Sequence, residues 1–423
     1  MIRIGKPVIE NQGDLVILKA LVTNEAECKK DWIWYATSKE YGDFFCPETA
    51  DSFVVPMILR AVKTHQDILV ESEISEKLFY NLNNSVFYAL EKAGEFQFGK
   101  GHIRIIANKL RSEPFNGACV GTGCSLGVDS FAVIKKYCLE KEVSEGYRIT
   151  HLSLFNAGAF GGTKNSNIEG VRRSFFEEVK RIEAFANRIE LPLVWVDSNV
   201  RWFYPESDFN WSHTYLNMGI VLSMQKLWQK YYYASGYSLE HLCFDIKDSA
   251  KYEPFLLPHI STESTELISA SMDMSRSDKV RYISTDEIVR KNLYVCLKDQ
   301  ISNNALIKNK YEGVYLNCGR CLKCERTLLQ LDIFNQLDEF SAIFDLSVWP
   351  KRKRYYIGEV IAGKKKNIMM MDLYNYMIDN NYEIPRFSRL YAIYVSSMSF
   401  VMKIRRKLKS IKRKLFCSRE NQT

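Results

Sequence analysis

Residues 117–142 read GACVGTGCSLGVDSFAVIKKYCLEKE, and this stretch decides the fold. A strand of small residues leads into a turn at 125–130, and a helical pattern follows from residue 131. Further strands are predicted at 150–158, 191–199 and 231–238, and helices at 166–190 and 213–231. Strands that alternate with helices in this way predict βαβ units, and therefore an α/β fold with a doubly wound, mostly parallel sheet.

The chain of 423 residues divides into four segments of different character. Residues 1–112 alternate short strand and helix patterns, such as DLVILKALV and ADSFVVPMILRAVKTH, and predict an N-terminal α+β domain. Residues 113–290 carry the βαβ pattern, 291–350 a cysteine cluster, and 351–423 a segment rich in lysine and arginine. Hydrophobic residues make up 46% and charged residues 26%, which argues against a disordered chain or a polytopic membrane protein.

The turn at 125–130, Ser-Leu-Gly-Val-Asp-Ser, has the composition of a phosphate-binding loop. Small residues let the backbone approach an anion, and the free N–H groups at a helix start hold phosphate oxygens. Ser125 and Ser130 can add hydroxyl donors, and Asp129 becomes useful if a Mg²⁺ ion bridges it to the phosphate. The sequence has neither GxxxxGK[ST] nor GxGxxG spacing. An ordinary strand–helix turn with a polar cap is the alternative.

These six residues resemble the SGGxDS motif of the PP-loop ATP pyrophosphatase superfamily, whose fold is HUP-like. Ser125, Gly127, Asp129 and Ser130 match the motif, and Val128 fills its variable position. Leu126 replaces the first glycine, a change that is tolerable if the φ angle of this leucine is negative.

The resemblance implies that residues 125–130 bind ATP together with Mg²⁺, and that the adenine lies near Asn156, at the end of the strand 150–158. It also implies transfer of AMP to a carboxylate or carbonyl oxygen, with release of pyrophosphate. Arg276 and Lys279 are the candidates for contacts with pyrophosphate or the acyl-adenylate. The alternative for these two residues is the solvated start of a charged helix.

The second motif is a cysteine cluster. Cys318, Cys321 and Cys324 form CxxCxxC, and Cys296, which lies 22 residues upstream, is the expected fourth ligand. Four thiolates in this arrangement suit a tetrahedral Zn²⁺ site. An iron–sulfur cluster also uses closely spaced cysteines, and buried free cysteines are the third possibility.

The segment NCGRCLKCERT resembles the zinc motif of the 7-cyano-7-deazaguanine synthase family, which belongs to the PP-loop superfamily. The resemblance covers about 116–335, roughly half of the chain. Residues between the two motifs do not match the substrate-binding part of those enzymes. The resemblance therefore implies a shared scaffold with a different substrate, in a PP-loop paralogue with an added N-terminal domain.

The net charge of +8 is unevenly distributed. From Pro385 onward there are 11 basic residues and one acid, so the rest of the chain has a net charge of −2. Lys403 to Lys414 alone contain eight basic residues. This tail could contact RNA phosphates or an anionic membrane surface, or it could be a solvated helix.

Cysteine usage and the N-terminal sequence predict the cellular compartment. The 11 cysteines are odd in number and irregularly spaced, and the N-terminus has no apolar run of signal-peptide length. The most apolar run, Leu390 to Met402, is too short to span a bilayer as a helix. We therefore expect a cytoplasmic protein, with peripheral attachment at the inner membrane surface as an option for the tail.

The leading hypothesis is an ATP-dependent, AMP-forming ligase that acts on a small-molecule acceptor. The attacking nitrogen would come from free ammonia or from a partner, because residue 2 is isoleucine and no N-terminal catalytic cysteine is present. The alternatives are a tRNA-modifying PP-loop enzyme and a non-catalytic nucleotide-binding protein. Cys124, beside the turn, could carry sulfur in a tRNA-thiolating enzyme, although packing is the favoured role of a small buried cysteine.

Overall fold

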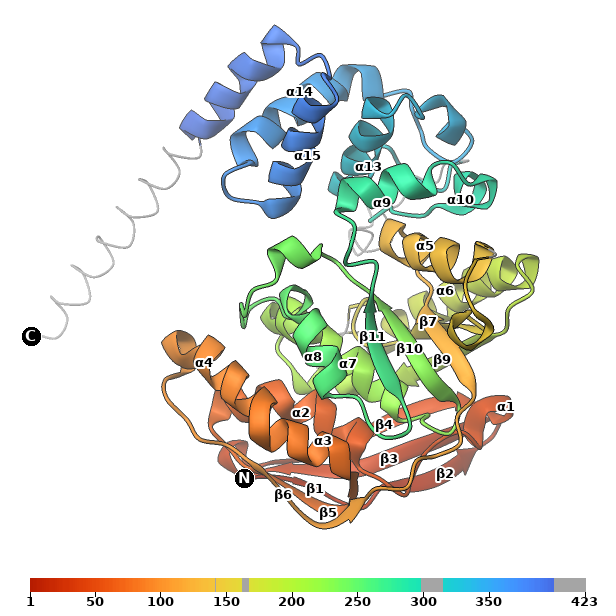
Figure 1. The fold of residues 1–423 in the computed structure, drawn as a ribbon, viewed down its shortest axis with the longest axis vertical. Coiled ribbons are helices and arrows are strands. Elements are labelled where there is room, and N and C mark those ends of the chain that lie inside the picture. The colour runs from red at the N-terminus through yellow and green to blue at the C-terminus, as the bar shows by residue number, and fades with distance from the viewer. Residues whose placement is uncertain (141, 162–166, 298–314, 399–423) are drawn as a thin grey trace, which may run out of the picture. The chain divides into compact units, whose positions relative to one another are not determined.

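A computed structural model describes residues 1–140, 142–161, 167–297 and 315–398 (Figure 1). The chain forms two compact units. Unit 1 comprises Met1–Ser275 together with Asn292–Tyr294, and unit 2 comprises Arg276–Lys291 and the chain from Val295 onward. Among the residues described, no helix is both long and apolar enough to cross a membrane.

Unit 1 is built on one mixed, mostly parallel sheet of 11 strands, which confirms the predicted α/β class. Ten strands follow the order β11-β10-β7-β8-β9-β4-β3-β1-β5-β6, and β2 pairs with β3. The strands are β1 (Ile2–Ile4), β2 (Val8–Gln12), β3 (Leu15–Asn24), β4 (Lys29–Ser38), β5 (Ile68–Ser75), β6 (Ile105–Arg111), β7 (Cys119–Gly123), β8 (His151–Phe155), β9 (Leu193–Ser198), β10 (Trp228–Ala234) and β11 (Glu266–Ala270).

The five strands β7 to β11 are parallel to one another. Their order across the sheet is β9-β8-β7-β10-β11, so the chain winds outward from β7 in one direction and then from β10 in the other. The order reverses between β7 and β10. Open α/β sheets bind ligands at the carboxyl ends of the strands beside such a reversal.

Helices cover both faces of this parallel half (Figure 1). On one face lie α5 (Val128–Ile134) and α6 (Ile168–Arg188), which meet through the rings of Phe131 and Phe185 at 5.4 Å. On the other face α7 (Phe209–Leu222) packs against α2 (Asp51–Thr64). The two helices approach each other closely at Gly219, where a Cβ atom would lie 2.3 Å from the Pro56 side chain.

The N-terminal strands extend the same sheet. In β3 every second residue is buried, the pattern of a strand with one face on the core, and β3 forms a long hairpin with β4. β4 then pairs antiparallel with β9 through Tyr35 with Ser198 and Ala36 with Asp197. The hydroxyl of Thr37 donates to the Trp195 carbonyl at 2.7 Å beside this pairing. The sheet therefore continues across the boundary that the sequence predicts near residue 112.

The remaining helices of residues 1–275 lie around this sheet. They are α1 (Lys39–Gly42), α3 (Glu76–Asn81), α4 (Phe87–Phe98) and α8 (Glu253–His259). The predicted helix at 213–231 is wrong at its carboxyl end, since α7 ends at Leu222 and β10 begins at Trp228. The turn between them, residues 223–227, reads SMQKL and contains no glycine or proline, so the sequence does not mark this boundary.

Unit 2 consists mainly of helices. They are α9 (Arg276–Ile283), α10 (Glu287–Asn292, ending at the border with unit 1), α13 (Leu322–Ile333), α14 (Trp349–Gly363), α15 (Ile368–Asp379) and a further helix at 386–398. The sequence predicts a helix from Thr327 to about Leu337, whereas α13 begins earlier, at Leu322. Cys321 is its N-cap residue. Residues Lys403 to Lys414 of the predicted basic tail lie outside the described residues.

Candidate functional site

The predicted phosphate loop follows β7, the central strand of the parallel half. The buried Cys124 ends the strand with its amide donating to the Ser153 carbonyl of β8 at 2.8 Å. Ser125 is exposed, and Gly127 forms the N-cap of α5 with extended backbone. The N–H groups of the first turn of α5 therefore start at the carboxyl edge of the sheet, beside the reversal of strand order.

Leu126 adopts a left-handed backbone conformation, with φ of 53°. The condition under which the sequence makes this leucine tolerable, a negative φ, is therefore not met. The side chain is buried, and the Leu126 carbonyl accepts a hydrogen bond from the Tyr294 amide at 2.8 Å. Burial of the side chain and this hydrogen bond stabilise the left-handed conformation. That conformation costs a residue with a Cβ about 1–2 kcal/mol of free energy and costs glycine little. The bend thus has a glycine-like backbone at the position where the PP-loop motif has its first glycine.

The Ser130 side chain stabilises the bend through two hydrogen bonds to its backbone. Its hydroxyl accepts a hydrogen bond from the Ser125 amide at 3.2 Å and donates one to the Gly123 carbonyl at 3.1 Å. The buried Ser130 therefore orders the loop. Val128 is fully buried, whereas Asp129 is half-buried in the first turn of α5.

Burial distinguishes the two interpretations of Cys124. The thiol is enclosed, and burial raises its pKa to about 12. A sulfur carrier needs an accessible thiolate, which this environment disfavours. The geometry supports the packing role.

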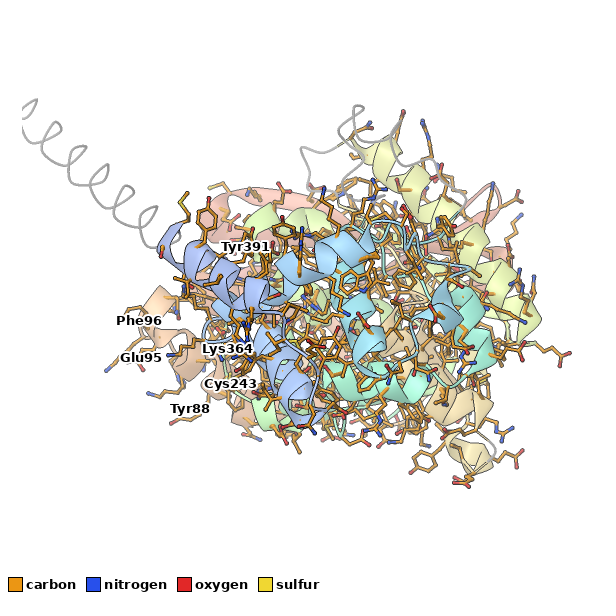
Figure 2. The ribbon with its side chains drawn as sticks, turned by 90° about the horizontal axis from the view of Figure 1, so that it is seen from above. Tyr88, Glu95, Phe96, Cys243, Lys364 and Tyr391 are labelled. Carbon is orange, nitrogen blue, oxygen red and sulfur yellow. The ribbon has the colours of Figure 1, made fainter. Side chains whose placement is uncertain are left out.

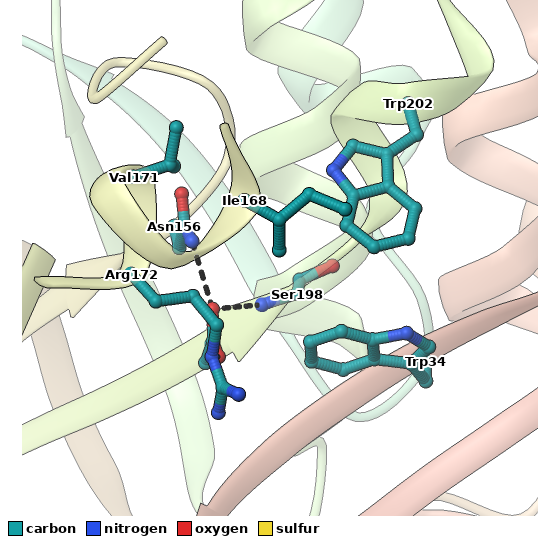
Figure 3. A pocket seen from close by; sticks show the side chains of 8 residues that line it. Trp34, Asn156, Ile168, Val171, Arg172, Ser198 and Trp202 are labelled. Carbon is teal, nitrogen blue, oxygen red and sulfur yellow. Dashed lines mark hydrogen bonds and ion pairs between the residues drawn. The ribbon is translucent and has the colours of Figure 1, made fainter. Parts of the chain in front are cut away.

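Asn156 lies at the same edge of the sheet as the bend, directly after β8. Its side-chain amide donates to Asp197 Oδ1 at 2.8 Å (Figure 3). Asp197 is buried near the end of β9, and it also accepts from the Ser198 amide at 3.0 Å and from Arg172 Nε at 2.7 Å. This carboxylate therefore fixes the orientation of Asn156.

A small recess with a cavity volume of about 10 Å³, room for about one water molecule and partly open to solvent, lies next to this cluster (Figure 3). Its lining residues are Trp34, Asn156, Ile168, Val171, Arg172, Asp197, Ser198 and Trp202. The indoles of Trp34 and Trp202 meet edge to face with 6.3 Å between ring centroids. Among these residues the sequence predicts only Asn156. The sequence signal that could have identified Asp197 is its position directly after the predicted strand residues LPLVWV.

Arg276 and Lys279 belong to α9 of unit 2, whereas the bend belongs to unit 1. Lys279 is buried, with only 1% of its surface exposed. The neighbouring Ser277 donates to Asp372 and accepts from Gln330, both at 2.9 Å. The interaction of Arg276 and Lys279 with pyrophosphate stays a prediction.

The four predicted cysteine ligands come together in unit 2. The sulfur atoms of Cys296, Cys318, Cys321 and Cys324 all lie within 4.8 Å of one another. The Sγ atoms of Cys318 and Cys324 are 3.9 Å apart, close to the ~3.8 Å that tetrahedral Zn–S bonds of ~2.3 Å produce. The cluster can therefore hold a metal ion such as Zn²⁺, with all four positions filled by protein.

Backbone amides stabilise negative charge on the sulfur atoms of this cluster. The amides of Leu297 and Cys318 donate to the sulfur atoms of Cys321 and Cys296, each at 3.4 Å. Cys321 and Cys324 also lie at the N-terminus of α13, whose dipole favours thiolates. Hydrogen bonds among the four side chains lower the pKa values of Cys318 and Cys321 and raise those of Cys296 and Cys324.

Gly319 gives the cysteine loop its shape. Its φ is 65°, and a Cβ there would lie 2.1 Å from the carbonyl oxygen of Asp345. Arg320, the next residue, pairs with the Asp345 carboxylate at 3.1 Å. A side chain at 319 would therefore displace the turn that carries Cys318 and Cys321.

No protein-family model, no curated protein and no solved structure matches this chain. The fold class and the cysteine cluster therefore rest on the structure itself.

Proposed function

We propose that the protein is an ATP-dependent, AMP-forming ligase of the PP-loop type. The observation that carries the proposal is the position of the bend 125–130, which follows the central strand β7 at the reversal of strand order. The left-handed Leu126 adds support, because it gives the bend the backbone of a glycine-containing phosphate loop.

In this proposal the backbone amides of residues 126–130 bind the triphosphate, and the adenine lies near Asn156. Asp129 would hold Mg²⁺, which when bound neutralises charge on the phosphates. An acceptor carboxylate or carbonyl oxygen attacks the α-phosphorus, and the bond to the β-phosphate oxygen breaks with release of pyrophosphate. Ammonia or another nucleophile then displaces AMP from the adenylated carbon and loses a proton.

For the cysteine cluster we propose a structural Zn²⁺. In a [4Fe–4S] cluster each cysteine binds a different iron, and in a [2Fe–2S] cluster two cysteines bind each iron, so sulfurs on different irons lie farther apart than four sulfurs around a single ion. The short sulfur–sulfur separations therefore favour one tetrahedral ion. With four protein ligands the ion has no open position for substrate, so its role is to stabilise unit 2. Elemental analysis of the purified chain should find about one zinc per chain and no iron.

The catalytic proposal is tested with ATP labelled at the α-phosphate, incubated with Mg²⁺ and a panel of carboxylates. We expect labelled AMP and free pyrophosphate with the correct acceptor. Formation of ADP and phosphate would instead contradict the proposal.

Binding of α,β-methylene ATP provides a test that needs no acceptor. Asp129→Asn should weaken Mg²⁺-dependent binding at least tenfold, because the proposed metal ligand loses its charge. The control is Asp14→Asn, since Asp14 is fully exposed in the same unit. Binding that Asp129→Asn leaves unchanged would remove the bend from the nucleotide site.

A further inference from the structure

The last described helix, residues 386–398, presents an apolar face to solvent. Leu390 is 68% exposed, Ile393 65% and Tyr394 58%. Phe387 and Met398 add to the same side of the helix at 39% and 41%. At 100° per residue these five side chains fall on one stripe about 140° wide. Large exposed apolar patches of this kind mark interaction surfaces.

The opposite face fixes this helix to unit 2. Ser388 and Ala392 are buried, and the Ser388 hydroxyl donates to the Arg354 carbonyl of α14 at 2.7 Å. The rings of Tyr355 and Tyr391 meet at 5.1 Å, and Tyr391 is labelled in Figure 2. The ring of Phe387 also meets Tyr355 at 5.0 Å, whereas Leu390, Ile393 and Tyr394 stay largely exposed.

Positive charge accompanies this apolar stripe. The helix contains Arg386 and Arg389 and no acidic residue. The sequence that follows it has eight basic residues between Lys403 and Lys414, and the first acid after Pro385 is Glu420. Apolar side chains beside dense Lys/Arg charge are the composition of segments that bind the surface of anionic bilayers.

We propose that residues 386–398 bind the surface of an anionic membrane, with Leu390, Ile393 and Tyr394 inserted among the lipids and with Arg386 and Arg389 attracted to the headgroups. This proposal is independent of the ligase activity. RNA fits less well, because aliphatic side chains such as Leu390 and Ile393 gain nothing from a phosphate backbone. A second copy fits less well, since two tails of net charge +10 would repel each other.

The test is co-sedimentation of the full chain with phosphatidylcholine vesicles, with or without about one third phosphatidylglycerol. We expect binding to the anionic vesicles that weakens with salt. The double variant Leu390→Ser/Ile393→Ser should lower the vesicle affinity by about 10- to 100-fold, because two inserted side chains are lost. Changing Lys403, Arg405, Arg406 and Lys407 to Gln should lower it by about several hundredfold, at roughly fivefold per charge.

The matched control is Phe96→Ser. Phe96 is 96% exposed on α4, away from residues 386–398 in the sequence, and it should not affect vesicle binding (Figure 2). Circular dichroism and metal content should be unchanged in every variant. Three results would overturn the proposal: equal binding to neutral and anionic vesicles, tail-dependent binding of tRNA without vesicle binding, or a dimer in solution that the Leu390/Ile393 double variant dissociates.

Discussion

The bend 125–130 and the cysteine cluster would hold their proposed ligands by different means. In the cluster, four side chains converge within 4.8 Å, and each supplies one sulfur. In the bend the proposed phosphate ligands are backbone amides, and Asp129 is the one side chain proposed to hold Mg²⁺, while Leu126 and Ser130 shape the backbone. A side-chain site therefore depends on residue identity at each ligand position, whereas a backbone site depends on geometry that a different residue can reproduce.

The largest effect is expected when one of the four cysteine sulfurs of the cluster is removed. Cys324→Ser should reduce bound zinc from about one per chain to nearly none and destabilise unit 2 by about 5 kcal/mol, because metal binding contributes directly to folding. Elemental analysis and thermal unfolding measure both effects. The exposed Cys243 gives the control Cys243→Ser, which should keep its zinc. Full zinc content in Cys324→Ser would exclude a four-cysteine site.

Gly319→Ala tests whether the cluster also depends on its backbone. The new Cβ would collide with the Asp345 carbonyl, and φ is positive, so we expect a loss of about 3 kcal/mol together with weaker zinc retention. The control Gly13→Ala has a similar φ of 59° with no atom within 4 Å of the new Cβ. It should cost only about 1 kcal/mol. Equal losses in the two variants would contradict the steric argument.

Low pH should destabilise unit 1 through protonation of His213. Burial lowers the pKa of His213 to about 4, and its Nδ1 lies 3.0 Å from the Tyr233 hydroxyl. Between pH ~6.5 and ~4, His213 binds a proton in the unfolded chain but not in the folded protein. The stabilisation that the neutral imidazole contributes to the folded protein is therefore complete above pH ~6.5 and is lost as the pH falls toward ~4. We expect a loss of about 2 kcal/mol over this range in urea unfolding.

His213→Gln should flatten this part of the pH profile, while the exposed His102→Gln should leave it as in the wild type. An unaltered profile in His213→Gln would assign the acid sensitivity to other groups.

The smallest expected effect is at Leu126. Leu126→Gly removes a left-handed leucine, a gain of about 1–2 kcal/mol, but it also removes a buried side chain worth about 1.5–3 kcal/mol. The net result should be a destabilisation of about 1 kcal/mol in urea unfolding, with binding of α,β-methylene ATP retained. A tenfold loss of nucleotide binding would show that the leucine side chain itself is needed.

Local patterns predicted much of this molecule. Alternation gave the β3 and β4 strands and the class of the fold, and the spacing of Cys318, Cys321 and Cys324 predicted their proximity. The pairing of β4 with β9 connects residues far apart in the chain, and no local period encodes it. For the same reason the sequence missed Asp197 and Trp34, which meet only because that pairing forms. The sign of φ at Leu126 depends on burial and on Tyr294, which composition does not reveal.

The junction between β4 and β9 has a practical consequence for anyone who shortens the chain. A fragment that starts near Asn116 would keep all five parallel strands but would uncover the hydrogen-bonding edge of β9. Asn199, whose side chain bridges the backbone of Trp32 and Trp34, would lose both partners. Such an open edge pairs with other chains, so we expect the fragment to aggregate even though its five parallel strands are complete in sequence.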